Sequence, residues 1–211
     1  RYKTLEDGDS LVLHIFKPRN MQAGEKRPAI VYFFGGGWKL GTPIQFYREC
    51  AYYASKGMVA VSVDYRIGYL HHSTPFESFE DAKDAICWLR SHASDYQLDP
   101  DKIAVAGGSA GGHLAAALGT IGSDETVPAG YRPNLSLLYY PVIDMVSRGY
   151  GFPEIKRDFE KISPIHHVSE ATPSTLILLG TKDPIVSVET IEAYQDKLLQ
   201  KGVDCELHLF E

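Results

Sequence analysis

The sequence has little of what marks several large classes of protein. Only three cysteines occur in 211 residues, Cys50, Cys87 and Cys205, and none forms a CxxC pair. A disulfide scaffold is therefore not expected, and we interpret the three thiols as buried structural groups that pack as small hydrophobic side chains. No apolar run approaches the roughly 18 residues that a membrane-spanning helix needs.

The sequence also lacks a basic cluster. Its formal net charge is −6, its pI is about 5.7, and its Lys and Arg residues are scattered, so no nucleic-acid partner is expected. The first residues lack the basic, apolar and small-residue order of a signal peptide. Because the chain starts at Arg1 rather than Met, the compartment, cytoplasmic or secreted and periplasmic, is left open.

What the sequence has is the composition of an ordinary globular protein. Hydrophobic residues make up 44% and charged residues 23%, close to the averages for such proteins. A length of 211 residues fits one domain, which we expect to span residues 1–211.

Short apolar runs alternate with segments of helical spacing. The runs that predict buried strands are Ala29–Phe34, Val59–Val63, Ile103–Ala106, Leu135–Tyr140 and Thr175–Leu179. The clearest helical spacing repeats at three and four residues, in Phe79, Ala82, Ile86 and Leu89. This alternation predicts an α/β fold with a doubly wound, mostly parallel sheet.

Two segments depart from the alternation. Leu11–Phe16 alternates apolar and polar residues, which predicts antiparallel edge strands at the N-terminus. The stretch from Asp144 to Pro173 is rich in Pro, Gly and charge. We expect it to be a surface excursion with one short helix, facing the substrate.

The strongest chemical signal is Gly-Gly-Ser-Ala-Gly-Gly at residues 107–112, directly after the Ile103–Ala106 run. A G-x-S-x-G motif between a strand and a helix is the nucleophile elbow of serine hydrolases, which makes Ser109 the candidate nucleophile. The alternative is a Gly-rich phosphate loop. That alternative is disfavoured because no Lys precedes a Ser or Thr here and GxGxxG does not match.

A second glycine-rich segment, Phe34-Gly-Gly-Gly-Trp38, follows the first long strand. Acyl transfer develops an oxyanion, and backbone N–H groups aimed at it accelerate the reaction by roughly 10²–10³ per donor. The proposed donors are the amides of Gly36, Gly37 and Ala110. The plain alternative is a Gly-rich turn.

With Asp64-Tyr-Arg66 and Gly180-Thr-Lys-Asp183, these motifs resemble the hormone-sensitive-lipase-like and carbohydrate-esterase branches of the α/β-hydrolases, including acetylxylan and feruloyl esterases. The resemblance covers nearly the whole chain. It implies an α/β-hydrolase fold, a Ser-Asp-His triad in that order, hydrolysis of carboxylic esters and no cofactor. The family usually has His-Gly-Gly-Gly in the oxyanion loop, so Phe34 is a departure that removes any hydrogen bond from that histidine.

The acid of the implied triad is expected after a late strand, where Asp183 stands, and Asp144 is the reserve candidate. The implied histidine lies after the last strand, Cys205–Phe210, and is expected just beyond Glu211. His208 lies within that strand and is a weak candidate. The pairs His71/His72 and His166/His167 have no catalytic match and no metal-binding spacing, so no metal site is expected. His113 is expected to pack on its helix.

The expected substrate is a small-molecule or polysaccharide ester. Because the oxyanion loop begins early, no large cap is expected, and an open cleft suits short acyl or aryl-acyl groups, acetyl or feruloyl, on carbohydrate. Trp38, with Tyr69, Tyr139 and Tyr140 nearby, is the candidate substrate platform. Alternatives are a small-molecule esterase or arylformamidase, an exopeptidase-like hydrolase, and a non-catalytic binding protein of the same fold. The oligomeric state is left open.

Overall fold

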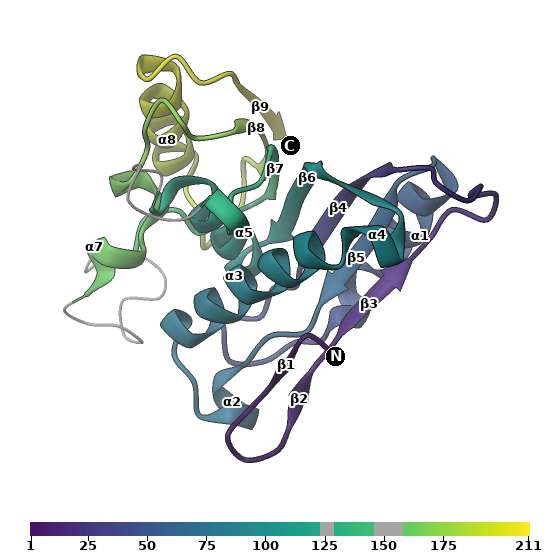
Figure 1. Cartoon of the computed structure of the whole chain (residues 1–211). Coiled ribbons are helices and arrows are strands. Elements are labelled where there is room, and N and C mark those ends of the chain that lie inside the picture. Colours follow the sequence, from purple (N-terminus) through teal and green to yellow (C-terminus); the bar gives the residue numbers. More distant parts are fainter. Residues whose placement is uncertain (123–128, 146–157) are drawn as a thin grey trace.

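A seven-stranded sheet forms the centre of the molecule (Figure 1). The computed structural model describes residues 1–122, 129–145 and 158–211. The strand order is β3-β5-β4-β6-β7-β8-β9, and every pair is parallel except β3 with β5. The strands are β3 (Leu13–Phe16), β4 (Arg27–Phe33), β5 (Val59–Val63), β6 (Leu98–Gly108), β7 (Leu135–Tyr139), β8 (Ser174–Gly180) and β9 (Cys205–Phe210).

A separate two-stranded ribbon, β1 (Lys3–Thr4) with β2 (Ser10–Leu11), precedes the sheet. The predicted doubly wound α/β fold with antiparallel strands at the N-terminus is thus confirmed. Each predicted strand is present, and two of them, Val59–Val63 and Cys205–Phe210, have the bounds that the sequence indicated.

The helices connect successive strands. They are α1 (Tyr47–Ser55), α2 (Gly68–His71), α3 (Pro75–Ser91), α4 (Ala93–Tyr96), α5 (Ala110–Thr120), α7 (Phe159–Ile162) and α8 (Val188–Gln200), with 3₁₀ turns η1 (Pro43–Phe46), η2 (Ala129–Tyr131) and η3 (Pro164–His166). Residues 146–157 of the predicted excursion lie outside the described residues. Its described part contains α7 and η3, in agreement with the expected short helix.

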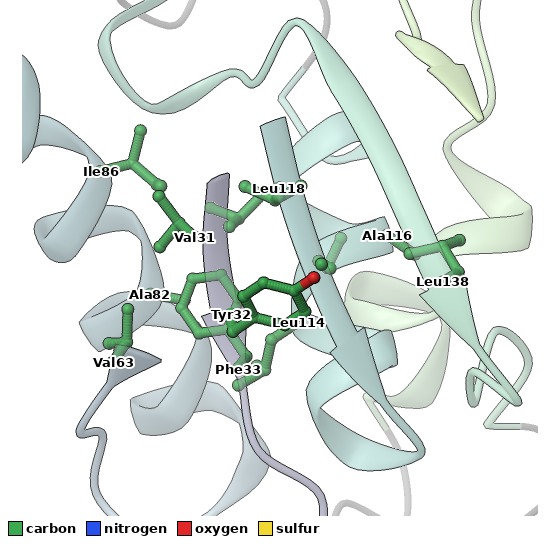
Figure 2. Packing of buried hydrophobic residues seen from close by; sticks show 14 of the residues in the cluster. Val31, Tyr32, Phe33, Val63, Ala82, Ile86, Leu114, Ala116, Leu118 and Leu138 are labelled. Carbon is green, nitrogen blue, oxygen red and sulfur yellow. The ribbon is translucent and has the colours of Figure 1, made fainter. Parts of the chain in front are cut away.

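The core lies between the sheet and its helices. On β4, Val31 and Phe33 are fully buried, and Figure 2 shows Val31 beside Ile86 of α3. The alternate residue Tyr32 is also fully buried, and its ring stacks on Phe46 of η1 with centroids 4.9 Å apart. Burial on both faces explains why residues 29–33 of β4 are continuously apolar rather than alternating.

Helix α3 is fixed at its start and on its buried face. Thr74 caps it in a capping box with Glu77, and Pro75 occupies the first turn, where a missing N–H is tolerated. The fully buried Asp81 accepts two bonds from the guanidinium of Arg66, at 2.8 Å each, one from the Arg66 backbone N–H at 3.0 Å and one from Lys3 at 2.6 Å. This network joins the N-terminal ribbon and the loop after β5 to α3.

The prediction for the cysteines was correct only for Cys50, which is buried. Cys87 is exposed, and Cys205 is half-buried. Cys87 lies on α3, whose buried stripe contains Ile86 and Leu89, so its position on the helix turns the thiol away from the core. Among the described residues, no helix is both long and apolar enough to cross a membrane.

Candidate active site

Ser109 stands alone between strand and helix. β6 ends at Gly108 and α5 begins at Ala110, so the turn between them is a single residue. Ser109 has φ 54° and ψ −118°, a backbone conformation that costs a non-glycine residue about 1–3 kcal/mol and that is concentrated at functional sites. Its N–H donates to the carbonyl of Tyr139 at 3.0 Å, and its side chain is half-buried.

The glycines of the motif allow neighbouring backbone to approach the turn. A Cβ on Gly111 would lie 2.0 Å from the carbonyl oxygen of Phe33, and one on Gly107 would lie 2.4 Å from the backbone of Gly111. A Cβ on Gly112 would lie 2.9 Å from Pro141. The motif is therefore a packing requirement as well as a turn signal.

The triple-glycine segment lies beside the nucleophile. A Cβ on Gly35 would lie 3.5 Å from Cβ of Ser109, an ordinary contact distance. The next residues turn sharply: φ is 137° at Gly36, 62° at Gly37 and 58° at Trp38. Within residues 1–122, 129–145 and 158–211, the amides of Gly36, Gly37 and Ala110 donate to no protein acceptor. Gly36, Gly37 and Ala110 stay the proposed oxyanion donors.

Other side chains brace this loop in place of the histidine that Phe34 replaces. The hydroxyl of Tyr65 donates to the carbonyl of Phe34 at 2.6 Å, and the two rings stack with centroids 4.1 Å apart. On the next residue, the Gly35 amide donates to the side-chain oxygen of Gln45 at 2.6 Å. Burial raises the pKa of the Tyr65 phenol far above its usual range, so the group stays protonated and able to donate.

Trp38 does not form the predicted substrate platform. Its side chain is 1% exposed, and the indole Nε1–H donates to Nδ1 of His113 at 3.3 Å. The prediction failed because the left-handed backbone at Trp38 turns the ring into the core. Of the three tyrosines named with it, Tyr69 is 73% exposed and Tyr140 is 41% exposed, whereas Tyr139 is half-buried.

Asp183 follows β8 at the same edge of the sheet as Ser109. Only β7 separates β6 from β8, so their strand axes lie about 10 Å apart. The Oδ1 atom of Asp183 accepts from the amides of Ile185 at 2.8 Å and Val186 at 2.9 Å. These bonds fix the carboxylate and leave Oδ2 without a protein donor among the described residues. In the reserve candidate, Asp144, the Oδ1 atom lies 3.8 Å from Nε2 of His166.

None of the eight histidines, all of which lie within the described residues, hydrogen-bonds the Ser109 hydroxyl or the Asp183 carboxylate. His208 is on β9, where it pairs in register with Leu178, and its ring lies 3.2 Å from Glu206. His113 is fully buried, and both of its ring nitrogens have partners. The triad histidine expected after the last strand therefore stays a prediction.

Tyr65, Gln45 and His113 support the site, a role that was not predicted for them from the sequence. Tyr65 was within reach, because it follows a buried strand inside the Asp64-Tyr-Arg66 motif. The role of Gln45 could not be predicted, because nothing in the sequence distinguishes this glutamine from one on the surface. Among the described residues, no group of three His, Cys, Asp or Glu side chains is arranged to hold a metal ion.

A serine at a strained strand-to-helix turn, beside a glycine-rich loop on a mostly parallel sheet, defines the α/β-hydrolase class. Residues 13–146 match the family model described as BD-FAE. The chain belongs to the BD-FAE family of α/β-hydrolases. The predicted resemblance is thereby confirmed.

The relatives that resemble this chain in sequence and in structure are esterases. The chain is similar to esterase LipC of Mycobacterium tuberculosis, 28% identical over 91% of this chain and 53% of the relative, and to an acetylxylan esterase of Xylanibacter ruminicola, 26% identical over 98% of this chain and 43% of the relative. This chain thus spans about half the length of these curated relatives. It also matches native esterase Est2 of Thermogutta terrifontis, a thermophilic esterase, with a TM-score of 0.91 and 37% identity over 100% of this chain and 79% of that one. The same esterase has been solved with propionate bound, with butyrate bound and phosphonylated by sarin.

Proposed function

We propose that this protein is a serine carboxylester hydrolase with Ser109 as its nucleophile. The observation that carries the proposal is the close approach of the strained Ser109 turn to the glycine loop, where a Cβ added to Gly35 would lie 3.5 Å from Cβ of Ser109. Membership of an esterase family and similarity to an esterase that sarin phosphonylates support it. Organophosphorus agents of this kind react with an activated nucleophile, the role assigned here to Ser109.

The chemistry follows from the positions of these groups. The Ser109 oxygen attacks the ester carbonyl and passes its proton to the triad histidine that the family pattern places after the last strand. Negative charge develops on the carbonyl oxygen, and the amides of Gly36, Gly37 and Ala110 stabilise it. Collapse of the intermediate expels the alcohol with that proton and leaves an acyl-serine, which water then hydrolyses. Asp183 orients the histidine and stabilises its charged form.

The finer proposal concerns the substrate. We propose that the enzyme removes short acyl or aryl-acyl groups, acetyl or feruloyl, from carbohydrate. The family assignment and the acetylxylan esterase among the relatives support this substrate class. The propionate and butyrate bound to the Thermogutta esterase support a small acyl group.

The test is hydrolysis of a matched panel by the full-length protein, with Ser109→Ala as the control. The panel contains acetylated xylan, feruloylated arabinoxylan and p-nitrophenyl acetate and butyrate. Activity on both glycans supports the carbohydrate proposal, and activity on the p-nitrophenyl esters alone indicates a small-molecule esterase. A wild-type protein that hydrolyses no ester would refute the proposed function and favour a binding protein.

A further inference from the structure

His113 is a buried polar residue that the proposed reaction does not use. It lies in the first turn of α5, where its backbone N–H donates to the carbonyl of Ser109 at 2.9 Å. Its side chain points away from that turn and contacts two other segments. The indole N–H of Trp38 donates to Nδ1 at 3.3 Å, with the two rings edge to face at 88°, and Nε2 lies 2.7 Å from the carbonyl oxygen of Ile162.

These contacts determine the protonation state of the imidazole. An indole N–H only donates and a carbonyl oxygen only accepts, so both bonds form together only when Nδ1 is bare and Nε2 carries the proton. Burial lowers the pKa of His113 from 6.5 to about 4, which keeps the ring neutral at physiological pH. The one imidazole thus accepts from the glycine loop and donates to the end of α7.

Trp38 completes the turn that carries two of the proposed oxyanion donors. The amides of Lys39 and Leu40 both donate to the carbonyl of Gly36 at 3.1 Å, and the carbonyl of Trp38 accepts from Gly68 at 2.8 Å. Trp38 holds a left-handed conformation, with φ 58°, which a bulky residue adopts only where its surroundings enforce it. The hydrogen bond to His113 anchors the indole there.

We propose that His113 is a positioning residue for ester hydrolysis: by fixing the indole of Trp38, it sets the direction of the Gly36 and Gly37 amides relative to Ser109. The inference rests on the proposed function of Ser109. This positioning role of His113 differs from a packing role because it depends on one acceptor atom, Nδ1. Apolar neighbours on the same helix, such as Leu114, fill space there without any polar contact.

Two substitutions separate the two bonds. In His113→Asn, the short amide places its oxygen near the position of Nδ1, so Trp38 keeps an acceptor. In His113→Gln, the longer amide reaches toward the Ile162 carbonyl and leaves Trp38 without one. Trp38→Phe removes the indole N–H from the other side. The matched control is His92→Gln. His92 stacks on the chain's other tryptophan, Trp88 of α3, with ring centroids 4.0 Å apart.

The experiment measures kcat and KM on p-nitrophenyl butyrate, and inhibition by a trifluoromethyl ketone, in the full-length protein. We expect His113→Gln and Trp38→Phe to lower kcat about tenfold with KM changed less than twofold, and to weaken the ketone by a similar factor. His113→Asn is expected to lose about threefold, and His92→Gln nothing. Equal losses in His113→Asn and His113→Gln, or an unaffected Trp38→Phe, would overturn the proposal.

A second readout does not depend on catalysis. The sequence has two tryptophans, so the indole N–H of Trp38 is assigned in a ¹H–¹⁵N spectrum by its absence from Trp38→Phe. We expect its downfield shift and slow exchange to persist in His113→Asn and to be lost in His113→Gln. An unchanged signal in His113→Gln contradicts the inference. A wild type that shows the expected spectra but hydrolyses no ester instead contradicts the proposed function of Ser109.

Discussion

At the level of single residues, the site depends on glycines, whose lack of a Cβ lets neighbouring backbone approach closely. Gly111 lies against the end of β4, where a Cβ would approach the carbonyl oxygens of Phe33 and Phe34 to 2.0 and 2.4 Å. The Phe34 carbonyl cannot move away freely, because the hydroxyl of Tyr65 donates to it. The contact joins the helix after the nucleophile to the start of the oxyanion loop.

We therefore expect Gly111→Ala to destabilise the protein by about 3 kcal/mol, the upper end of what overpacking usually costs, and to lower kcat at least tenfold. Urea denaturation and ester hydrolysis measure the two effects. Gly130→Ala is the matched control, because its added methyl would meet only the Cys87 sulfur at 3.5 Å. Equal stability of the two variants would show that the loop does not need this close approach.

The brace on Phe34 gives a second prediction at this scale. Tyr65→Phe keeps the ring stack but leaves a buried carbonyl without its donor, which costs about 1–3 kcal/mol. We expect that loss in urea denaturation, together with a lower kcat. Tyr52→Phe serves as the comparison, since Tyr52 is 56% exposed. A Tyr65→Phe variant as stable and active as the wild type would remove this residue from the site.

At the scale of elements, the helices are held by polar contacts as well as by the core. Asp81 on α3 is fully buried and accepts from Arg66 and Lys3, whose side chains are 22% and 23% exposed. Removing one partner of a buried ion pair leaves uncompensated charge behind. This one carboxylate therefore contacts both the N-terminal ribbon and the loop after β5.

Asp81→Asn should lower the free energy of unfolding by about 3 kcal/mol, measured by urea denaturation. The neighbouring Asp84→Asn also breaks a 2.6 Å contact to Lys3, but Asp84 is 51% exposed, and such surface pairs contribute at most about 1 kcal/mol. The difference between the variants is the test. Similar values would mean that the buried network has no special role in holding α3.

The elements of the fold were predictable from the sequence to a larger extent than the orientation of single side chains. The strands and their sequence along the chain follow from continuous apolar runs. The nucleophile elbow follows from the G-x-S-x-G motif, whose spacing leaves few alternatives. The orientation of Trp38 could not be predicted, because it depends on a left-handed backbone angle and on a histidine 75 positions away. Gln45 was missed for a similar reason, since its partner is a backbone amide brought near by tertiary packing. The triad histidine and the extent of the domain are still predictions.

At the scale of the whole molecule, the buried His113 links folding to pH. Its pKa is 6.5 when exposed in the unfolded chain and about 4 in the folded protein, so the unfolded state binds the proton first as the pH falls. Stability is therefore lost between pH 6.5 and pH 4, by up to about 3 kcal/mol, and this term is constant below that window.

We expect the Tm to fall as the pH is lowered through this window, and to fall less steeply in His113→Asn, which has no proton to bind at this position. Differential scanning calorimetry of both proteins at several pH values measures the difference in slope. Because carboxylates titrate alike in the two proteins, that difference isolates the histidine. Parallel curves would show that the buried imidazole does not control acid stability.

If Ser109 is an activated nucleophile, a reagent that reacts covalently with such serines should label it. The full-length protein is treated with a fluorophosphonate, digested and sequenced by mass spectrometry, with residual ester hydrolysis followed in parallel. We predict one adduct per chain, on the peptide that contains Ser109, with activity lost in step with labelling and no adduct in Ser109→Ala. An intact Ser109 in an inactivated protein, or an adduct on another serine, would contradict this role for Ser109.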